Sequence, residues 1–306
     1  MPTFLQELAQ KLLKDHNNDL SQLVVMFPSQ RARVFFNNAI GENLNTPTWQ
    51  PRYTTIDEIM ERSSGYTIGD RIKLIIELYK VYLKKFPNES FDRFYHWGEV
   101  LISDFDMIDK SMIDANNLLV NIRDIKKIEV DLSYLSEEQI RIIMTFWNSV
   151  HAIGTPSEQK LRFLEVWNAL PFIYHEYRKE LKKQKIGYAG LVYRETAERI
   201  KTRKENIELE PCKHIIAGFN ALSESERILF DHIAKSAPDT EFYWDYDDYY
   251  VSNDNIKKHE AGMFMRRNIK EFPSKSPLSH NNFKDIKKHI SVTACVSNIA
   301  QVKHIE

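Results

Sequence analysis

Apolar residues follow two different spacings along this chain, and the changes between them divide it into three parts. A continuous apolar run from Leu23 to Phe27 is typical of a buried β-strand. A helix is predicted after it, to about Ile40, with Ser29 placed to cap its first turn. A second short strand is expected over residues 48–54 and a helix over residues 55–62. This alternation of strands and helices is typical of an α/β layer.

The middle of the chain, from about residue 70 to residue 205, carries helical periodicity. Apolar residues recur at three- and four-residue intervals from Ile72 to Phe86 and again over residues 91–108. A capping box of Ser136 and Gln139 predicts the start of a further helix. A long helix is then expected over residues 157–185, with a kink at Pro171. A shorter helix is expected over residues 188–201.

The α/β pattern returns in the last third of the chain. Strands are predicted over residues 214–219, 240–246 and 289–294, a capping box of Ser223 and Glu226 starts a helix, and another helix begins at Asn298. The chain ends within that last helical pattern, so we expect it to be the N-terminal part of a longer polypeptide. The predicted fold is a mostly parallel α/β sheet built from residues 1–65 and 210–306, interrupted by an all-helical domain over residues 70–205.

Composition narrows the choice of partners. The 42 basic residues balance the 43 acidic ones, so the net charge of −1 gives no global attraction for nucleic acid or membrane, and any such contact must use a local patch. No uncharged stretch approaches the length of roughly 20 residues that a membrane span needs. The two cysteines, Cys212 and Cys295, fit neither a disulfide framework nor a metal site. We therefore expect a cytoplasmic protein.

Five local strings stand out along the chain: VVMFPSQRARVFFN, FYHWGEVLISDFDMID, YAGLVYRETAERI, IIAGFNALSESERILF and FYWDYDDYY. They resemble the N-terminal part of AddB-type subunits of helicase-nucleases, in the form found in Bacteroidetes. The resemblance implies a RecA-like (P-loop NTPase-type) motor domain interrupted by a helical domain, as in UvrD-type superfamily 1 helicases, and a nuclease further along the chain. It also implies a role in double-strand break resection, beside a catalytic partner subunit of AddA type.

The two sites that a working motor needs are both degenerate. A phosphate loop requires glycines, a lysine and a hydroxyl in the pattern GxxxxGK[ST], but Pro28, Ser29, Gln30 and Arg31 stand after the first strand. Magnesium-binding acids are expected at the end of a second apolar strand, where Gly218, Phe219 and Asn220 are found instead. We therefore expect no nucleotide, metal or other cofactor in this region, and no catalytic residue.

Other catalytic patterns are weak. Pro238 and Asp239, with the triplet DIK at residues 285–287, superficially match a PD-(D/E)xK nuclease, but DIK also occurs at residues 124–126 and neither copy lies in an apolar strand. Glu224 and Glu226 are better explained as acids of a first helical turn. The acids of the string WDYDD are better explained as solvated loop residues: Asp245, Asp247 and Asp248.

The candidate DNA contacts are Arg31 and Arg33, in the first turn after one strand, with Tyr53 and Thr54 at the end of another, because open α/β sheets bind ligands at the carboxyl ends of their strands. Cations in a first helical turn are unfavourable against the helix dipole, so a DNA phosphate or a carboxylate such as Glu58 is expected nearby. Weaker candidates are the basic runs 178–185 and 199–204 and the aromatic residues Tyr249 and Tyr250.

The sequence thus favours a non-catalytic, helicase-like scaffold that contacts DNA weakly and binds a catalytic partner. Two alternatives remain open. The chain could be a DNA-processing enzyme in its own right, either an ATPase or a nuclease, or a protein-interaction module without any DNA contact.

Overall fold

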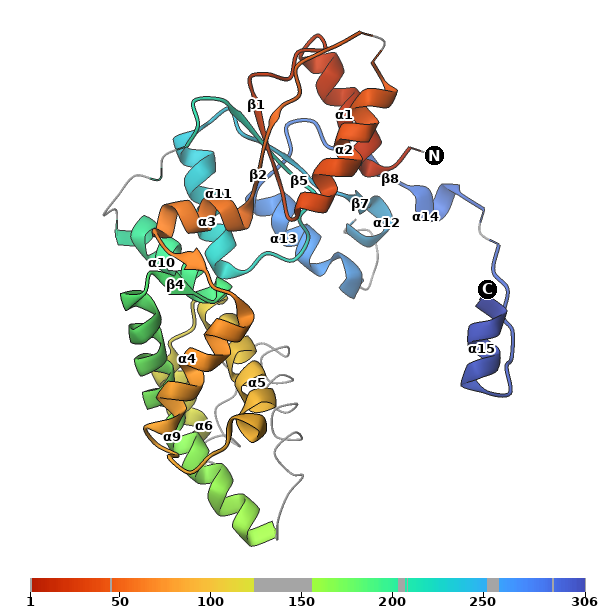
Figure 1. The fold of residues 1–306 in the computed structure, drawn as a ribbon. Coiled ribbons are helices and arrows are strands. Elements are labelled where there is room, and N and C mark those ends of the chain that lie inside the picture. Colours follow the sequence, from red (N-terminus) through yellow and green to blue (C-terminus); the bar gives the residue numbers. More distant parts are fainter. Residues whose placement is uncertain are drawn as a thin grey trace.

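The computed structural model describes residues 2–44, 46–123, 156–202, 207, 209–251, 259–287 and 289–305. The protein is a mixed α/β protein in which a small parallel sheet with helices on both faces stands beside a group of helices (Figure 1). The predicted capping box at Ser136 and the DIK triplet at residues 124–126 lie outside the described residues.

The main sheet joins strands from two distant parts of the chain. Its order is β2-β1-β5-β6, and every neighbouring pair runs parallel. The strands are β1 (Leu23–Phe27), β2 (Arg52–Thr55), β5 (Lys213–Ala217) and β6 (Glu241–Tyr243). Leu23 lies opposite Lys213, so the predicted parallel sheet between the N-terminal and later segments is confirmed.

Both faces of this sheet are buried, as the continuous apolar run of β1 predicts. On one face Val25 and Phe27 pack beneath helices α1 (Phe4–Asp15) and α2 (Gln30–Glu42). On the other face Met26 joins a core formed with α3 (Ile56–Ser64), α10 (Ala189–Thr202), α11 (Glu224–Ser236) and α13 (Met263–Glu271). The two capping boxes, Thr55 with Glu58 and Ser223 with Glu226, start α3 and α11.

The middle of the chain forms a separate helical core. Its helices are α4 (Arg71–Leu83), α5 (Phe91–Lys110), α6 (Ala115–Arg123) and α9 (Pro156–Lys183). Pro171 lies inside α9, and the two halves of that helix run in different directions in Figure 1. A two-stranded parallel sheet of β3 (Thr67–Ile68) and β4 (Ile186–Gly187), which the sequence does not predict, lies at the end of this part beside α10 (Figure 1).

Several predicted boundaries in the last third of the chain were wrong. The strand expected over residues 240–246 divides into β6 and β7 (Tyr246–Asp247), and β7 pairs with β8 (Ser279–His280) in another sheet. No strand occurs over the described residues 289–294, where the alternating side chains of Ile290 and Val292 are 82% and 94% exposed. Alternation alone does not make a strand when no sheet edge lies beside it.

The remaining elements are short. They are α12 (Asp248–Val251), the 3-10 helix Glu260–Gly262, α14 (Asn282–Asp285) and α15 (Asn298–Ile305), which begins where predicted and lies apart from the sheet in Figure 1. Both cysteines are free thiols. Among the described residues, no helix combines the length and the apolar character needed to cross a membrane.

Candidate nucleic-acid interface

The carboxyl ends of β2, β1 and β5 meet at one edge of the sheet, because the three strands are parallel neighbours. Phe27 lies opposite Thr55, and Met26 lies opposite both Thr54 and Ile216. The turn after β1 therefore lies between the start of α3 and the segment that follows β5. The turn at Pro28 and Ser29 and the segment from Gly218 to Asn220 are thus brought to the same edge.

The turn after β1 is only two residues long. Pro28 and Ser29 connect β1 to α2, and Ser29 has the extended backbone of an N-cap residue, with φ −151° and ψ 155°. Its side chain makes no capping hydrogen bond, although the sequence places a good capping residue there. A turn of this length cannot surround a phosphate group as a glycine-rich loop does.

The carboxylate of Glu58 lies beside this turn. Its Oε1 accepts a hydrogen bond from Gln30 Nε2 at 2.7 Å. Its Oε2 accepts hydrogen bonds from the backbone N–H of Thr55 at 2.9 Å and from Thr54 Oγ1 at 3.2 Å. One acidic side chain therefore links the first residue of α2 to the end of β2.

The segment after β5 carries no acid at the expected position. Gly218 has φ +78°, in the left-handed region that favours glycine, and its N–H donates to Tyr243 O at 3.2 Å. Phe219 is buried in the core, and the carbonyl of Asn220 accepts a hydrogen bond from Asn268 Nδ2 at 2.5 Å. Within the described part of the chain, no three His, Cys, Asp or Glu side chains are grouped so that they could hold a metal ion.

Arg31 and Arg33 are exposed on α2 close to this edge. Their guanidinium groups lie over aromatic rings, Arg31 5.8 Å from the centre of Phe35 and Arg33 5.1 Å from the centre of Tyr53. Neither has an ion pair within the described residues, and Glu58 bonds to Gln30. No acidic residue occurs between Gln30 and Gly41, so this side of α2 is cationic or neutral.

Tyr53 and Thr54 are less accessible than the sequence suggests. Tyr53 packs against Phe27 and Phe36, and its hydroxyl donates to Asn37. Burial raises the pKa of Tyr53 well above its ordinary value, although Arg33 opposes the shift, so the phenol stays neutral. Thr54 is only 9% exposed.

Sequence reasoning missed other accessible groups on α2. A shallow hollow of about 390 Å³ on α2 is lined by Gln30, Arg33, Val34, Asn37 and Asn38. Phe35 is 53% exposed. The signal was available in the sequence, because these residues fall at helical spacing on the side of α2 opposite the buried residues Phe36, Ala39 and Ile40.

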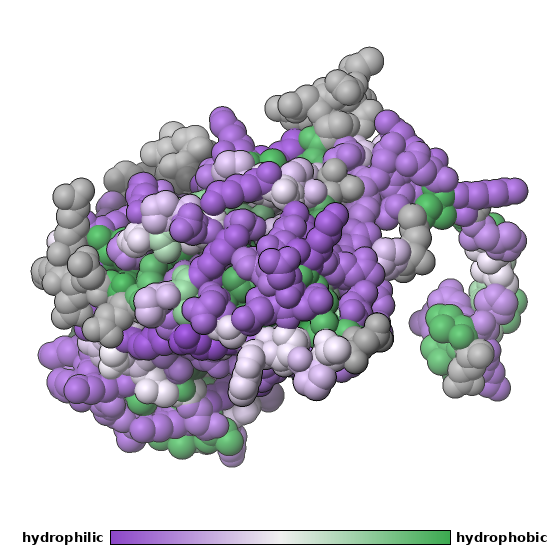
Figure 2. Space-filling view, turned by 90° about the horizontal axis from the view of Figure 1, so that it is seen from above, coloured by the Kyte–Doolittle hydropathy of each residue, from purple (hydrophilic) through white to green (hydrophobic). Residues whose placement is uncertain are grey.

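The upper face of the molecule in the orientation of Figure 1 is mainly polar. Seen from above, hydrophobic side chains are scattered among hydrophilic ones on that face (Figure 2).

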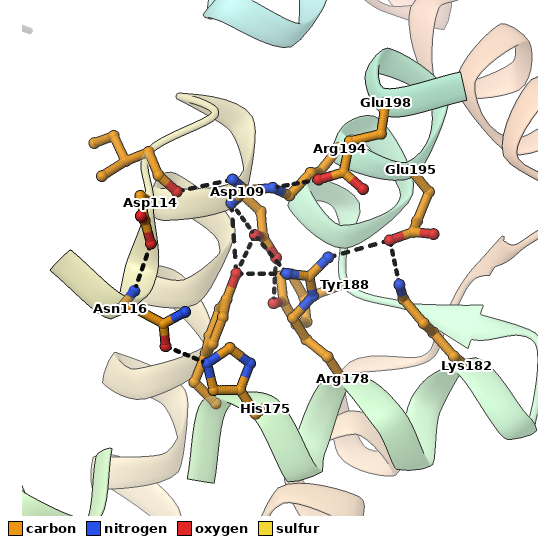
Figure 3. Close-up of polar contacts among 12 residues, drawn as sticks. Asp109, Asp114, Asn116, His175, Arg178, Lys182, Tyr188, Arg194, Glu195 and Glu198 are labelled. Atoms are coloured by element: carbon orange, nitrogen blue, oxygen red, sulfur yellow. Dashed lines mark hydrogen bonds and ion pairs between the residues drawn. The ribbon is translucent and has the colours of Figure 1, made fainter. Parts of the chain in front are cut away.

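The basic run 178–185 is engaged elsewhere. Arg178 donates to Glu195 and to Tyr174, and Lys182 pairs with Glu195 at 2.5 Å (Figure 3). Lys179 and Lys183 are exposed, but each has an acid of α9 within 4 Å. The run is mostly neutralised by its own helices, and Lys204 of the second run lies outside the described residues.

The other candidate side chains are also explained by local structure. Tyr249 stacks on Phe283 at 4.0 Å and contacts Tyr250 edge to face. Asp247 accepts the backbone N–H groups of Tyr249 and Phe283. Burial raises the pKa of Asp245, which has no acidic neighbour grouped with it for a metal among the described residues.

Comparisons with known proteins add no assignment. No family model matches this chain, and no curated protein matches it.

Proposed function

We propose that this chain is a non-catalytic, helicase-like scaffold that contacts single-stranded DNA through the edge of its sheet. The observation that carries the proposal is the turn after β1. It is too short to surround a phosphate, and two guanidinium groups that have no ion pair among the described residues follow it on α2. Such an edge suits a few contacts to a nucleic-acid backbone better than a bound nucleotide triphosphate.

ATP hydrolysis would lack its main sources of transition-state stabilisation at this edge. No lysine stands in the turn to reach the phosphates, and no acid follows β5 to hold magnesium. The Glu58 carboxylate would also repel a triphosphate that entered the turn. These features support the proposal of a helicase-like scaffold without ATPase activity.

The proposed setting comes from the resemblance of five local strings to AddB-type subunits. In that setting the chain belongs to a cytoplasmic helicase-nuclease that resects double-strand breaks, and an AddA-type subunit supplies the motor activity. The parallel sheet interrupted in sequence by helices is consistent with this assignment.

Isothermal titration calorimetry with ATP and magnesium tests the non-catalytic part of the proposal. We expect no saturable heat at micromolar ATP, because Ser29, Gln30 and Arg31 cannot enclose phosphates. A saturable heat that disappears in Arg31→Ala would show a nucleotide site at the turn and would contradict the proposal.

A further inference from the structure

Glu58 places a negative charge where the proposed function requires a phosphate to approach. Its side chain and that of Gln30 are both exposed, so a ligand can reach the contact between them. Arg31 and Arg33 make no ion pair with Glu58, since their guanidinium groups lie over Phe35 and Tyr53. The carboxylate is therefore held by an amide, a backbone N–H and a hydroxyl, and its charge is not neutralised by either neighbouring cation.

We infer that the Gln30–Glu58 contact is autoinhibitory, in that the carboxylate holds the amide of Gln30 and repels the backbone of single-stranded DNA. This inference rests on the proposed function, because it assumes that DNA approaches this edge. DNA binding at α2 is then weak while the contact is closed. When the contact opens, Gln30 becomes free to donate to the ligand.

Opening this contact does not disturb the start of α3. Glu58 Oε2 bonds to the N–H of Thr55, and the hydroxyl of Thr55 accepts from the N–H of Glu58 at 3.3 Å, which completes the capping box. Only the bond from Oε1 to Gln30 connects to α2. The inhibitory contact and the cap use different carboxylate oxygens, so the first can break while the second remains.

A charge-neutral variant separates these two roles. Glu58→Gln keeps the size of the side chain, and glutamine serves in a capping box as glutamate does. Glu42→Gln is the matched control, because Glu42 lies at the other end of α2, where it accepts a bond from Gln6 at 3.2 Å. Both variants change the net charge by one unit. Glu58→Asp is the charge-preserving variant, with a side chain one methylene shorter.

The experiment is a fluorescence-anisotropy titration of labelled single-stranded DNA at low salt. We expect the Kd of Glu58→Gln to be lower than that of the wild type by about threefold to tenfold, as expected for removing one charge near a phosphate in a solvated site. Glu42→Gln should change the Kd by less than about twofold, since the charge there is distant and screened. Glu58→Asp keeps the negative charge, so it should tighten binding by less than Glu58→Gln does.

Each other outcome has a definite meaning. Two outcomes would overturn the inference and leave the DNA contact in place. The first is that Glu58→Gln and Glu42→Gln change the Kd equally. The second is that Glu58→Asp tightens binding as much as Glu58→Gln does. No binding by the wild type or by Glu58→Gln would instead refute the DNA contact of the proposed function.

Discussion

Asp109 shows at the scale of one residue how the helical part is held together. This carboxylate is fully buried at the end of α5, and it accepts hydrogen bonds from Tyr174 and Tyr188 at 2.5 Å and from Arg194 at 2.8 Å (Figure 3). Burial raises the pKa of Tyr188 well above its ordinary value, so the phenol keeps its proton and donates. Three helical segments therefore meet at a single charge.

Removing that charge should be strongly destabilising. In Asp109→Asn the guanidinium groups of Arg178 and Arg194 lose their buried partner, and breaking a buried ion pair costs about 3–5 kcal/mol. Urea unfolding measures the loss. The control is Asp92→Asn, an exposed change on the same helix that should cost about 0.5 kcal/mol or less. Equal stability of the two variants would show that the Asp109 network does not hold these helices together.

His214 should make stability depend on pH. It is 3% exposed in β5, and its Nδ1 has no hydrogen-bond partner among the described residues. Burial lowers the pKa of His214 below its ordinary value of about 6.5, Arg62 lowers it further, and Glu210 opposes the shift. The unfolded chain then binds the proton at a higher pH than the folded chain. Stability is therefore fully present above about pH 6.5 and is lost as the pH falls through the folded pKa.

The measurement is the free energy of unfolding between pH 7.5 and about 5, below the ordinary pKa of histidine, for the wild type and His214→Phe. The variant should lose less stability than the wild type as the pH falls. His96→Phe, at an exposed position, should follow the wild type. Burial raises the pKa of Asp104 to about 7, so this group stabilises the folded protein as the pH falls, opposite to His214. The difference between the unfolding curves of the variant and the wild type therefore reports on His214, whereas the wild-type curve alone combines both groups. Parallel curves for wild type and His214→Phe would contradict this role.

Some residues at the candidate interface could be predicted from the sequence, and others could not. Arg31 and Arg33 were expected near the edge of the sheet, and the structure places them there as exposed cations. The burial of Thr54 could not be predicted, because the inward face of a four-residue strand depends on its neighbours. A carboxylate such as Glu58 was expected beside Arg31 and Arg33, but no local pattern predicts that Glu58 bonds to Gln30, 28 positions away in the sequence.

At the scale of elements, α10 connects the helical core to the sheet. Leu191 belongs to the core of the helical part, while Val192 belongs to the core beneath the sheet. Tyr193 donates to Asp57 at 2.6 Å, and Thr196 donates to the carbonyl of Met60 at 2.9 Å.

The same helix approaches α5 closely at Gly190, where an added Cβ would lie 2.2 Å from the carbonyl oxygen of Asp106.

Two glycine substitutions test this close approach. Gly190→Ala should destabilise the protein by about 2–4 kcal/mol, because the backbone of α5 must move or α10 must shift. Gly41→Ala, in α2, has no atom within 4 Å of the added Cβ and should be neutral or stabilising by up to about 1 kcal/mol. Thermal unfolding of both variants gives the comparison. Similar melting temperatures would mean that α10 and α5 are not tightly packed at this point.

Elements with strong local signals were predicted well, and elements fixed by distant partners were not. The capping box of Ser223 and Glu226 correctly marks the start of α11. β3 and β4 were missed because two-residue strands carry no periodicity and depend on each other across the helical part. The strand predicted over residues 289–294 was wrong for a different reason. Apolar and polar side chains alternate clearly there, but no neighbouring strand among the described residues pairs with this segment.

At the scale of the whole molecule, charge limits how strongly DNA can bind. A net charge of −1 gives little long-range attraction for phosphate, and the basic run 178–185 is largely paired with acids. Local cations that have no ion pair among the described residues, such as those of α2, can contribute. Neutralising a few phosphates gives weak binding that salt readily abolishes.

The central claim is a weak DNA contact at α2 without catalysis, and fluorescence anisotropy with single-stranded DNA at two salt concentrations tests it most directly. The wild type should bind with a Kd of roughly tens of micromolar or weaker at low salt and lose binding by about 0.2 M salt. The double variant Arg31→Ala/Arg33→Ala should bind at least about fivefold more weakly. Lys179→Ala/Lys183→Ala, which removes the same charge from α9, should change the Kd by less than about twofold. Equal weakening by both double variants, or strong binding that salt does not reduce, would contradict the account, and no binding at low salt would favour a pure protein-interaction module.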